Sequence, residues 1–357
     1  MRADQLSGTE PLAAGTAFDA AGLQRWLQAR LPDCDGVMEV ARFRGGQSNP
    51  TMVLAFDGQR RLVVRKKPDG VLLPSAHAVD REFRVISALS GNGVPVARPR
   101  LFCPAEDSPL GTMFYVMDYV EGRSFWEPAL PAMAASERHA IYAEMGKCIA
   151  ALHMVDWRAA GLEGFGKPEN YVARQVSRWS GQYRASETET IAAMDDLIGW
   201  LPDHLPAQTR ASLIHGDYRI DNMIFAPHSP RILALVDWEL STIGDTMADF
   251  AYHTLTWLFP QLPYRGLGDV DLAGSGIPDM RSYRDDYLRL TGQENVSDRD
   301  WYSLIAFSLF RVAAIRQGIM KRVVEGTATS AHAATAGALA RPVAEMGWQF
   351  AEKAMRS

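Results

Sequence analysis

The sequence predicts an α+β protein with two lobes, in which a small antiparallel sheet precedes a mainly helical region. Three observations predict this class. Short runs of strand-forming residues gather in the first third of the chain, helical periodicity dominates after residue 122, and no internal repeat or low-complexity tract is present. We therefore expect an N-terminal leader and helix in residues 1–34, a first lobe in residues 35–121 and a second lobe in residues 122–357.

The elements of the first lobe follow from short local patterns. Residues 1–20 are rich in Ala, Gly and Thr and predict a loose leader. Helical spacing of Leu and Trp, followed by Pro, predicts a helix in residues 18–32. Asp57-Gly58 predicts a hairpin turn between two strands, and apolar residues along one side of residues 77–91 predict a helix on the sheet. The expected strands are residues 37–43, 51–56, 61–66 and 113–120.

The second lobe is predicted to be helical around two short apolar runs. The apolar run Leu304–Ile315 is interrupted by Ser308 and Arg311 and is too short to span a bilayer, so it predicts a buried helix. The other expected features are a helix in residues 137–157, two polar helices in residues 171–206, apolar runs at residues 223–225 and 232–238, a Gly- and Pro-rich loop at residues 260–279, and helices from there to the end.

Composition excludes some classes of partner. The chain has 357 residues, 47% of them hydrophobic and 22% charged, as in an ordinary globular protein. A net charge of −5 argues against a nucleic-acid binder that relies on bulk positive charge. Cys34, Cys103 and Cys148 form no metal-binding or disulfide pattern, and no signal peptide is evident. We expect a cytoplasmic protein without a nucleic-acid or membrane partner, and its oligomeric state stays open.

Residues 213–225, LIHGDYRIDNMIF, place several polar groups between apolar residues. Asp217 and Asn222 lie there, and Asp237 ends the next apolar run, ILALVDW. Oxygens of Asn and Asp are hard ligands that suit Mg²⁺, and a separate aspartate can accept a proton from a hydroxyl. These are the parts of a phosphoryl-transfer site. An Asx-rich turn followed by a helix-capping aspartate is the alternative interpretation.

HGDYRIDN followed by VDWE resembles the catalytic loop and metal-binding motif of the aminoglycoside phosphotransferase-like kinases, a family similar to protein kinases. The resemblance implies a protein-kinase-like two-lobe fold, ATP and Mg²⁺ as cofactors, and phosphoryl transfer to a hydroxyl of a small molecule. It implies that Asp217 is the catalytic base and that Asn222 and Asp237 hold Mg²⁺. It also implies that Asp249 braces the catalytic loop, and we expect His215 to bond backbone near that loop.

The same resemblance implies a phosphate-binding loop in RFRGGQSNPTMVLAF, residues 42–56. Gly45 and Gly46 would let backbone N–H groups approach phosphate, and Ser48 and Asn49 could donate as well. A plain hairpin is the alternative for two glycines between strands.

A cation for the ATP phosphates should come from RLVVRKK. The family pattern favours Arg65, and Lys66 is the close alternative. The two side chains point to opposite faces of the strand, and alternation alone does not show which face meets the nucleotide. The anchor of this cation would be Glu82 on the following helix, and a solvated surface pair is the alternative.

MFYVMDYVEG, residues 113–122, resembles a kinase hinge. Met117 would back the adenine, and backbone groups of Asp118 and Val120 would bond its edge. An ordinary strand is the alternative interpretation.

The acceptor is less well specified. Arg219 could meet substrate or the γ-phosphate, or simply pair with Asp221, and Glu239 could assist the metal or cap a helix. Three segments, RKKPDGVLLPSAHAVDREFRV, RQVSRWSGQY and FSLFRVAAIRQGI, resemble the kinase-like domain fused to acyl-CoA dehydrogenases and its free-standing bacterial relatives. The broader family resemblance covers roughly residues 35–325, and the closer resemblance of these three segments implies a hydroxyacyl-CoA or hydroxy acid as acceptor.

Basic and aromatic residues on two later segments suit such an anionic, partly apolar ligand, and solvated helix faces are the equal alternative. These residues are Arg174, Arg178, Trp179, Tyr183 and Arg184, and Arg311, Arg316, Lys321 and Arg322.

Other functions also stay open. An aminoglycoside or amino-alcohol kinase is one, and a catalytically silent protein that binds nucleotide or acyl-CoA is another. A metal phosphohydrolase would want more metal-ligating residues than these scattered histidines provide.

Overall fold

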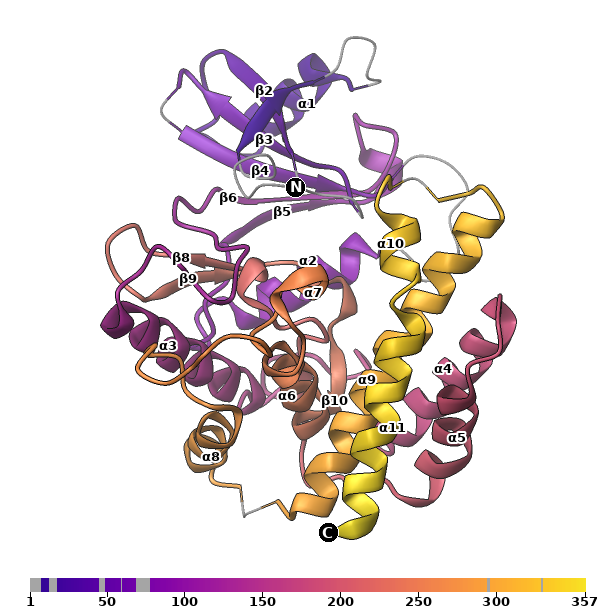
Figure 1. Cartoon of the computed structure of the whole chain (residues 1–357). Helices are drawn as coiled ribbons and strands as arrows, with labels where there is room; N and C mark the ends of the chain where they lie inside the picture. The colour runs from indigo at the N-terminus through magenta and orange to yellow at the C-terminus, as the bar shows by residue number, and fades with distance from the viewer. Residues whose placement is uncertain are drawn as a thin grey trace.

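The chain folds into two lobes, a sheet-containing lobe and a larger helical lobe (Figure 1). The computed structural model describes residues 8–12, 18–44, 49–58, 60–68, 78–293, 296–328 and 330–357. This is the kinase-like α+β class that the sequence predicted.

A six-stranded antiparallel sheet forms the first lobe, with strand order β1-β2-β3-β4-β6-β5. The predicted hairpin between β3 and β4 is confirmed, and Asp57 and Gly58 adopt φ of 47° and 70° there. β1 and β5 were not predicted. β1 lies inside the supposed loose leader and is too short to show alternation, while β5 opens with Pro99. The strands are β1 Thr9–Pro11, β2 Met38–Phe43, β3 Thr51–Phe56, β4 Arg60–Lys66, β5 Pro99–Cys103 and β6 Phe114–Asp118.

The two faces of this sheet pack against different helices. Leu62 and Val64 of β4 belong to a buried apolar cluster with Leu23 and Leu27 of α1 (Ala20–Gln28). Side chains alternate along a strand, so the neighbouring positions of β4 point to the opposite face. That face meets α2 (Val79–Leu89), which lies between the sheet and the helical lobe (Figure 1).

The helical lobe is organised around α9, which packs against α4, α5, α6, α10 and α11. The long helices predicted here are confirmed, and α9 extends beyond the predicted apolar run at both ends. Among the helices of the described residues, α9 alone is long and apolar enough to cross a membrane, and 72% of its most apolar window is buried inside the protein. The helices are α3 Ala135–His153, α4 Tyr171–Ser186, α5 Ala192–Trp200, α6 Thr246–Thr254, α7 Gln261–Tyr264, α8 Met280–Thr291, α9 Asp298–Val324, α10 Ala333–Gly337 and α11 Ala340–Arg356.

Two short antiparallel strand pairs lie within the helical lobe and carry its polar segments. β7 (Ala211–Ile214) pairs with β10 (Thr242–Asp245), and β8 (Met223–Phe225) pairs with β9 (Ile232–Leu235). The segment of polar residues between β7 and β8 is therefore fixed at both ends by paired strands.

Helix α6 places a neutral histidine in the core below this segment. His253 is 1% exposed, and its ring nitrogens contact the Tyr218 carbonyl at 2.9 Å and the Tyr283 hydroxyl at 3.1 Å. A carbonyl can only accept, so Nδ1 carries the hydrogen and Nε2 accepts from Tyr283. Burial lowers the pKa of His253 to about 4, so the ring stays neutral inside the fold.

We predict that Leu309→Ala lowers the free energy of unfolding by about 2–5 kcal/mol, because a fully buried leucine at the centre of α9 leaves a cavity. Val324→Ala on the same helix is the control, since Val324 is 66% exposed and should change stability by less than about 0.5 kcal/mol. Urea unfolding of both variants measures the difference. Equal effects would show that α9 is not the core element described above.

We predict that His253 makes the fold acid-sensitive. Its pKa in the unfolded chain is near 6.5, against about 4 in the fold. Between these values the unfolded chain binds more protons, so stability falls as the pH falls, by about 2 kcal/mol from neutral pH to near pH 5. Urea unfolding at neutral pH and near pH 5 measures this loss of stability. His253→Gln should remove the part that comes from His253, whereas His228→Gln, at an exposed position, should leave the pH dependence unchanged.

Candidate active site

The polar segment between β7 and β8 brings Asn222 and Asp237 to one end of a strand pair. Met223 of β8 pairs with Leu235 of β9, and the Val236 N–H donates to the Asn222 carbonyl at 3.0 Å. Asn222 precedes one strand and Asp237 follows the other, so the antiparallel register sets both at the same edge. Asp237 adopts φ of 66°, a left-handed conformation that aspartate tolerates better than most residues.

These two side chains fit a divalent cation bound together with phosphate. The Asn222 amide nitrogen donates to the Asp217 carbonyl at 2.9 Å and to its carboxylate at 3.1 Å, so the Asn222 amide oxygen is left without a partner among the described residues. One Asp237 oxygen accepts from Arg65, and the other has no hydrogen-bond partner in the part of the chain that the structure describes. In the described part of the chain, no group of three His, Cys, Asp or Glu side chains could hold a metal ion. Two hard oxygen ligands suit Mg²⁺, which draws the rest from phosphate and water.

Asp217 lies on the loop between β7 and β8, and the backbone of this loop is held by hydrogen bonds to Asp249. Asp249 of α6 is 3% exposed, and its carboxylate accepts from the main-chain N–H of His215 at 3.0 Å and of Gly216 at 2.9 Å. Burial alone would raise the pKa of Asp249, but the hydrogen bond from His153 and the backbone donors hold it below its usual range. The His215 ring lies between the Val236 carbonyl at 3.1 Å and the Asp217 N–H at 3.3 Å.

Gly216 is required by the close approach of a neighbouring segment. Its φ is +81°, and a Cβ atom there would lie 2.7 Å from the Leu240 carbonyl oxygen. Only glycine fits this position, so the His-Gly-Asp order has a steric cause.

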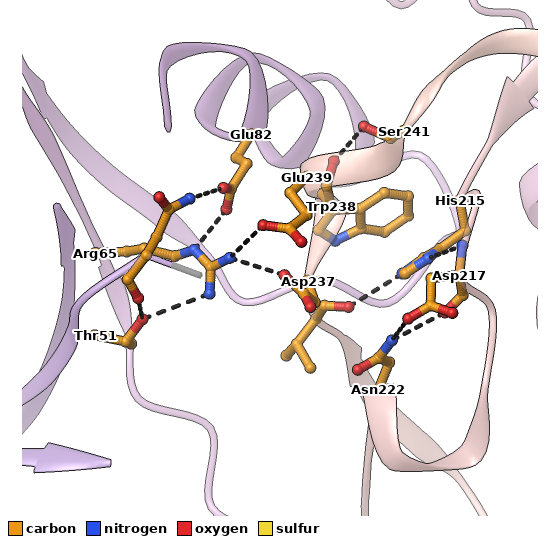
Figure 2. A network of polar contacts seen from close by, with 12 residues as sticks. Thr51, Arg65, Glu82, His215, Asp217, Asn222, Asp237, Trp238, Glu239 and Ser241 are labelled. Carbon is orange, nitrogen blue, oxygen red and sulfur yellow. Dashed lines mark hydrogen bonds and ion pairs between the residues drawn. The ribbon is translucent and has the colours of Figure 1, made fainter. Parts of the chain in front are cut away.

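Arg65, rather than Lys66, reaches the cleft. Its Nε donates to Glu82 at 2.7 Å and its Nη2 to Asp237 at 2.8 Å, so this one guanidinium joins α2, β4 and the end of β9 (Figure 2). Burial lowers the pKa of Arg65, but the attraction of Glu82 and of the other acidic groups around it together outweighs burial and raises the pKa above the usual value. Lys66 points to the other face of β4, the face that packs against α1.

Glu82 is held by more partners than the sequence indicated. It is 1% exposed and also accepts from Asn49 at 2.6 Å and from the Tyr115 hydroxyl at 3.0 Å. Asn49, which the sequence suggested as a possible donor to phosphate, donates to this carboxylate in the structure. The predicted phosphate-loop residues Gly45, Gly46 and Ser48 lie outside the described residues.

A cavity of about 250 Å³ lies between the two lobes, next to Arg65 and Asp237. All three hinge residues named from the sequence, Met117, Asp118 and Val120, line it. The Asp118 carboxylate pairs with Arg100 at 2.8 Å. The remaining walls are mainly apolar, as in many sites for small molecules. They include Phe43, Val63, Ile86, Ala97, Tyr115, Tyr119, Ile224, Leu235 and Trp238.

A second cavity, of about 240 Å³, is lined by Arg219, Ile220 and Asp221 of the loop between β7 and β8. Asp221 holds two arginines at its edge, Arg219 through a two-point ion pair and Arg265 at 3.2 Å. Burial would raise the pKa of Asp221, but the Arg219 guanidinium outweighs it and lowers that pKa. The lining also includes Trp126, Tyr252, Phe259, Tyr264, Ile315, Arg316 and Ile319. Arg265 and Tyr252 were missed because only the fold brings them to the loop.

Most of the acceptor residues suggested by the sequence lie elsewhere. Tyr183 is fully buried in the helical core, and neither it nor Arg178 or Trp179 lines either of these two cavities. Arg311 is 7% exposed and donates to the Gly216 carbonyl instead of facing a ligand. Of the basic residues that the sequence suggested on the two later segments, Arg316 alone lines the second cavity. A basic pattern on a helix does not reveal which of its faces the fold will bury.

Comparison with known proteins agrees with this geometry. The family model described as the phosphotransferase enzyme family matches residues 39–285. A solved structure from Ralstonia eutropha JMP134, provisionally assigned as an aminoglycoside phosphotransferase, is 47% identical with a TM-score of 0.86, and the match covers 94% of this chain and 99% of that one. Choline kinase from Cryptosporidium parvum is 13% identical with a TM-score of 0.63, covering 95% of this chain and 96% of that one, and so shares the fold.

Two curated mouse proteins are also similar. Acyl-CoA dehydrogenase family member 10 is 45% identical over 349 residues, which is 97% of this chain, and family member 11 is 38% identical over 364 residues, which is 100% of it. The chain spans only 32% and 46% of their respective lengths. The family match covers more than half of the chain and includes the catalytic loop and both suggested metal ligands. The chain therefore belongs to the phosphotransferase enzyme family.

Proposed function

We propose that this protein is an ATP- and Mg²⁺-dependent small-molecule kinase that transfers the γ-phosphoryl group to a hydroxyl. The observation that carries the proposal is the Arg65 guanidinium, which joins Glu82 and Asp237 across the cleft beside Asp217 and Asn222 (Figure 2). The proposed base, the proposed metal ligands and the cation proposed for the phosphates therefore lie close together, between the two cavities.

Each residue then has a distinct task. Residues 35–121 would hold the nucleotide, with Met117, Asp118 and Val120 along the adenine and Arg65 on the phosphates. Asn222 and Asp237 would hold Mg²⁺, which when bound neutralises phosphate charge. Asp217, with its carboxylate steadied by Asn222, would orient the acceptor hydroxyl and accept its proton.

We propose a hydroxyacyl-CoA or hydroxy acid as the acceptor. Two observations support an anionic, partly apolar ligand: the second cavity has three arginines against the single carboxylate of Asp221, and aromatic and aliphatic side chains form its other walls. The names of the curated relatives, which are acyl-CoA dehydrogenase family members, point to the same chemistry. A polycationic aminoglycoside would be repelled by these arginines.

The test is a search for product. The protein is incubated with ATP and Mg²⁺ and a mixture of hydroxyacyl-CoAs, hydroxy acids, amino alcohols and aminoglycosides, and mass spectrometry looks for a gain of one phosphoryl group. Phosphorylation of a hydroxyacyl compound supports the proposal. Phosphorylation of an amino alcohol or an aminoglycoside alone contradicts the acceptor class. ATP binding without any turnover across the panel favours a silent nucleotide-binding protein.

We predict that Asp217→Asn lowers kcat by roughly 10²- to 10⁴-fold, because the amide cannot accept the hydroxyl proton. Nucleotide affinity should stay within about threefold, since Asp217 does not line the cavity between the lobes. Steady-state kinetics and titration with a fluorescent ATP analogue measure the two quantities. Asp286→Asn, at an exposed position, is the control. Unchanged turnover in Asp217→Asn would sink the base assignment.

We predict that Arg65→Gln weakens ATP binding by about tenfold or more and lowers kcat, because it removes the charge that faces the phosphates. Lys66→Gln should weaken it much less, since Lys66 lies on the opposite face of β4. Exposed Arg42→Gln serves as the control for net charge. ATP titrations of the three variants decide between the two candidate cations, and a larger loss in Lys66→Gln would reverse the choice.

A further inference from the structure

Arg311 of α9 is a buried cation that forms no ion pair with any of the described residues. Its side chain is 7% exposed, and its Nη2 donates to the Gly216 carbonyl oxygen at 3.0 Å. Its Nε is buried and has no hydrogen-bond acceptor among the described residues, and no carboxylate in that part of the chain lies within 4.0 Å of its guanidinium. The Tyr252 ring lies 4.4 Å from the guanidinium carbon and the Trp179 ring 5.9 Å.

This arrangement is a poor way to stabilise a fold. Burying a charge is unfavourable unless it is paired and fully hydrogen-bonded, and an apolar side chain of similar size is often as good or better. The aromatic rings offset only part of that penalty. The position of Arg311 therefore calls for an explanation other than stability.

The hydrogen bond of Arg311 acts on the peptide group that immediately precedes the proposed base. The Gly216 carbonyl and the Asp217 N–H belong to one rigid, planar peptide unit. Arg311 holds the carbonyl end, and the His215 Nδ1 accepts from the N–H end at 3.3 Å. Asp249 fixes the preceding N–H of Gly216. The orientation of the Asp217 backbone, and so the direction of its carboxylate, depends on these three contacts.

The charge of Arg311 also suits its surroundings. The carboxylate of Asp249 is buried and accepts from the loop backbone at His215 and Gly216, and Asp217 follows directly in the chain. Burial lowers the pKa of Arg311, but nearby tyrosines and the carboxylates of Asp249 and Asp217 raise it, so the guanidinium remains charged. A hydrogen bond from a charged donor is about twice as strong as a neutral one.

We propose that Arg311 is a positioning residue for phosphoryl transfer, which sets the plane of the Gly216–Asp217 peptide and thereby aims the Asp217 carboxylate at the acceptor hydroxyl. This inference rests on the proposed function of Asp217. It assigns Arg311 no contact with ATP or with the acceptor.

The test compares Arg311→Met, which keeps the stem and removes the charge and donor, with Arg311→Lys, which keeps a charged donor. Arg311→Met should lower kcat by roughly 10- to 100-fold, because a small misplacement of a catalytic group has effects of this size. The KM for ATP should stay within about threefold, and Arg311→Lys should recover part of kcat. Turnover is measured with an acceptor found by mass spectrometry, or otherwise as slow MgATP hydrolysis.

Gln317→Met is the matched control. Gln317 is 1% exposed on the same helix and donates to the Ser186 carbonyl at 3.0 Å and to Thr188 at 2.7 Å, far along the chain from the catalytic loop. It should lose stability as Arg311→Met does, yet keep its kcat when assayed well below its unfolding temperature. An equal fall in kcat in both variants would reduce Arg311 to a general structural role and overturn the proposal.

Hydrogen–deuterium exchange provides a readout that needs no turnover. Arg311→Met should speed exchange in the peptide covering residues 213–222 while α11 remains as protected as in the unmodified protein. If the unmodified protein shows no ATP turnover at all, the proposed function fails, and exchange still decides whether Arg311 holds the loop. Unchanged exchange in that peptide would contradict the inference by itself.

Discussion

The buried carboxylate of Asp249 is the interaction on which the geometry of the site depends. Its oxygens accept from the main-chain N–H groups of His215 and Gly216 and from the ring of His153. Removing a carboxylate from water is unfavourable, and these donors offset that loss. Since they come from α3 and from the loop after β7, the packing of the helical lobe determines where Asp217, the proposed base, lies.

Around this carboxylate, the acids of the cleft are matched by arginines from different elements. Asp237 meets Arg65 of β4, and Asp221 meets Arg219 of its own loop and Arg265, which follows α7. So many carboxylates at one place would repel one another, and the arginines offset that repulsion. They leave one oxygen of Asp237 and the Asn222 amide oxygen without a partner among the described residues.

The sequence predicted the parts of the site that depend on local pattern. Asn222 and Asp237 were found because each flanks a short apolar strand, and the strand register then brings them together. The choice between Arg65 and Lys66 could not be made from alternation alone, because it required knowing that α1 covers one face of the sheet. Tyr183 was assigned to the acceptor, although the fold buries it, because the pattern of a helix does not show which neighbours will cover each face.

Helix α9 links the core, the loop between β7 and β8 and the second cavity, which is the proposed acceptor site, and this limits how that site can vary. Leu309 packs in the core, Arg311 holds the Gly216 carbonyl, and Arg316 lines the cavity beside Arg219 and Asp221. A shift of α9 that reshaped the cavity would also move the contact that orients Asp217. Replacing a side chain that only lines the cavity, such as Arg316, can therefore change which ligand is accepted. Such a change should disturb the proposed phosphoryl transfer less than a movement of the whole helix would.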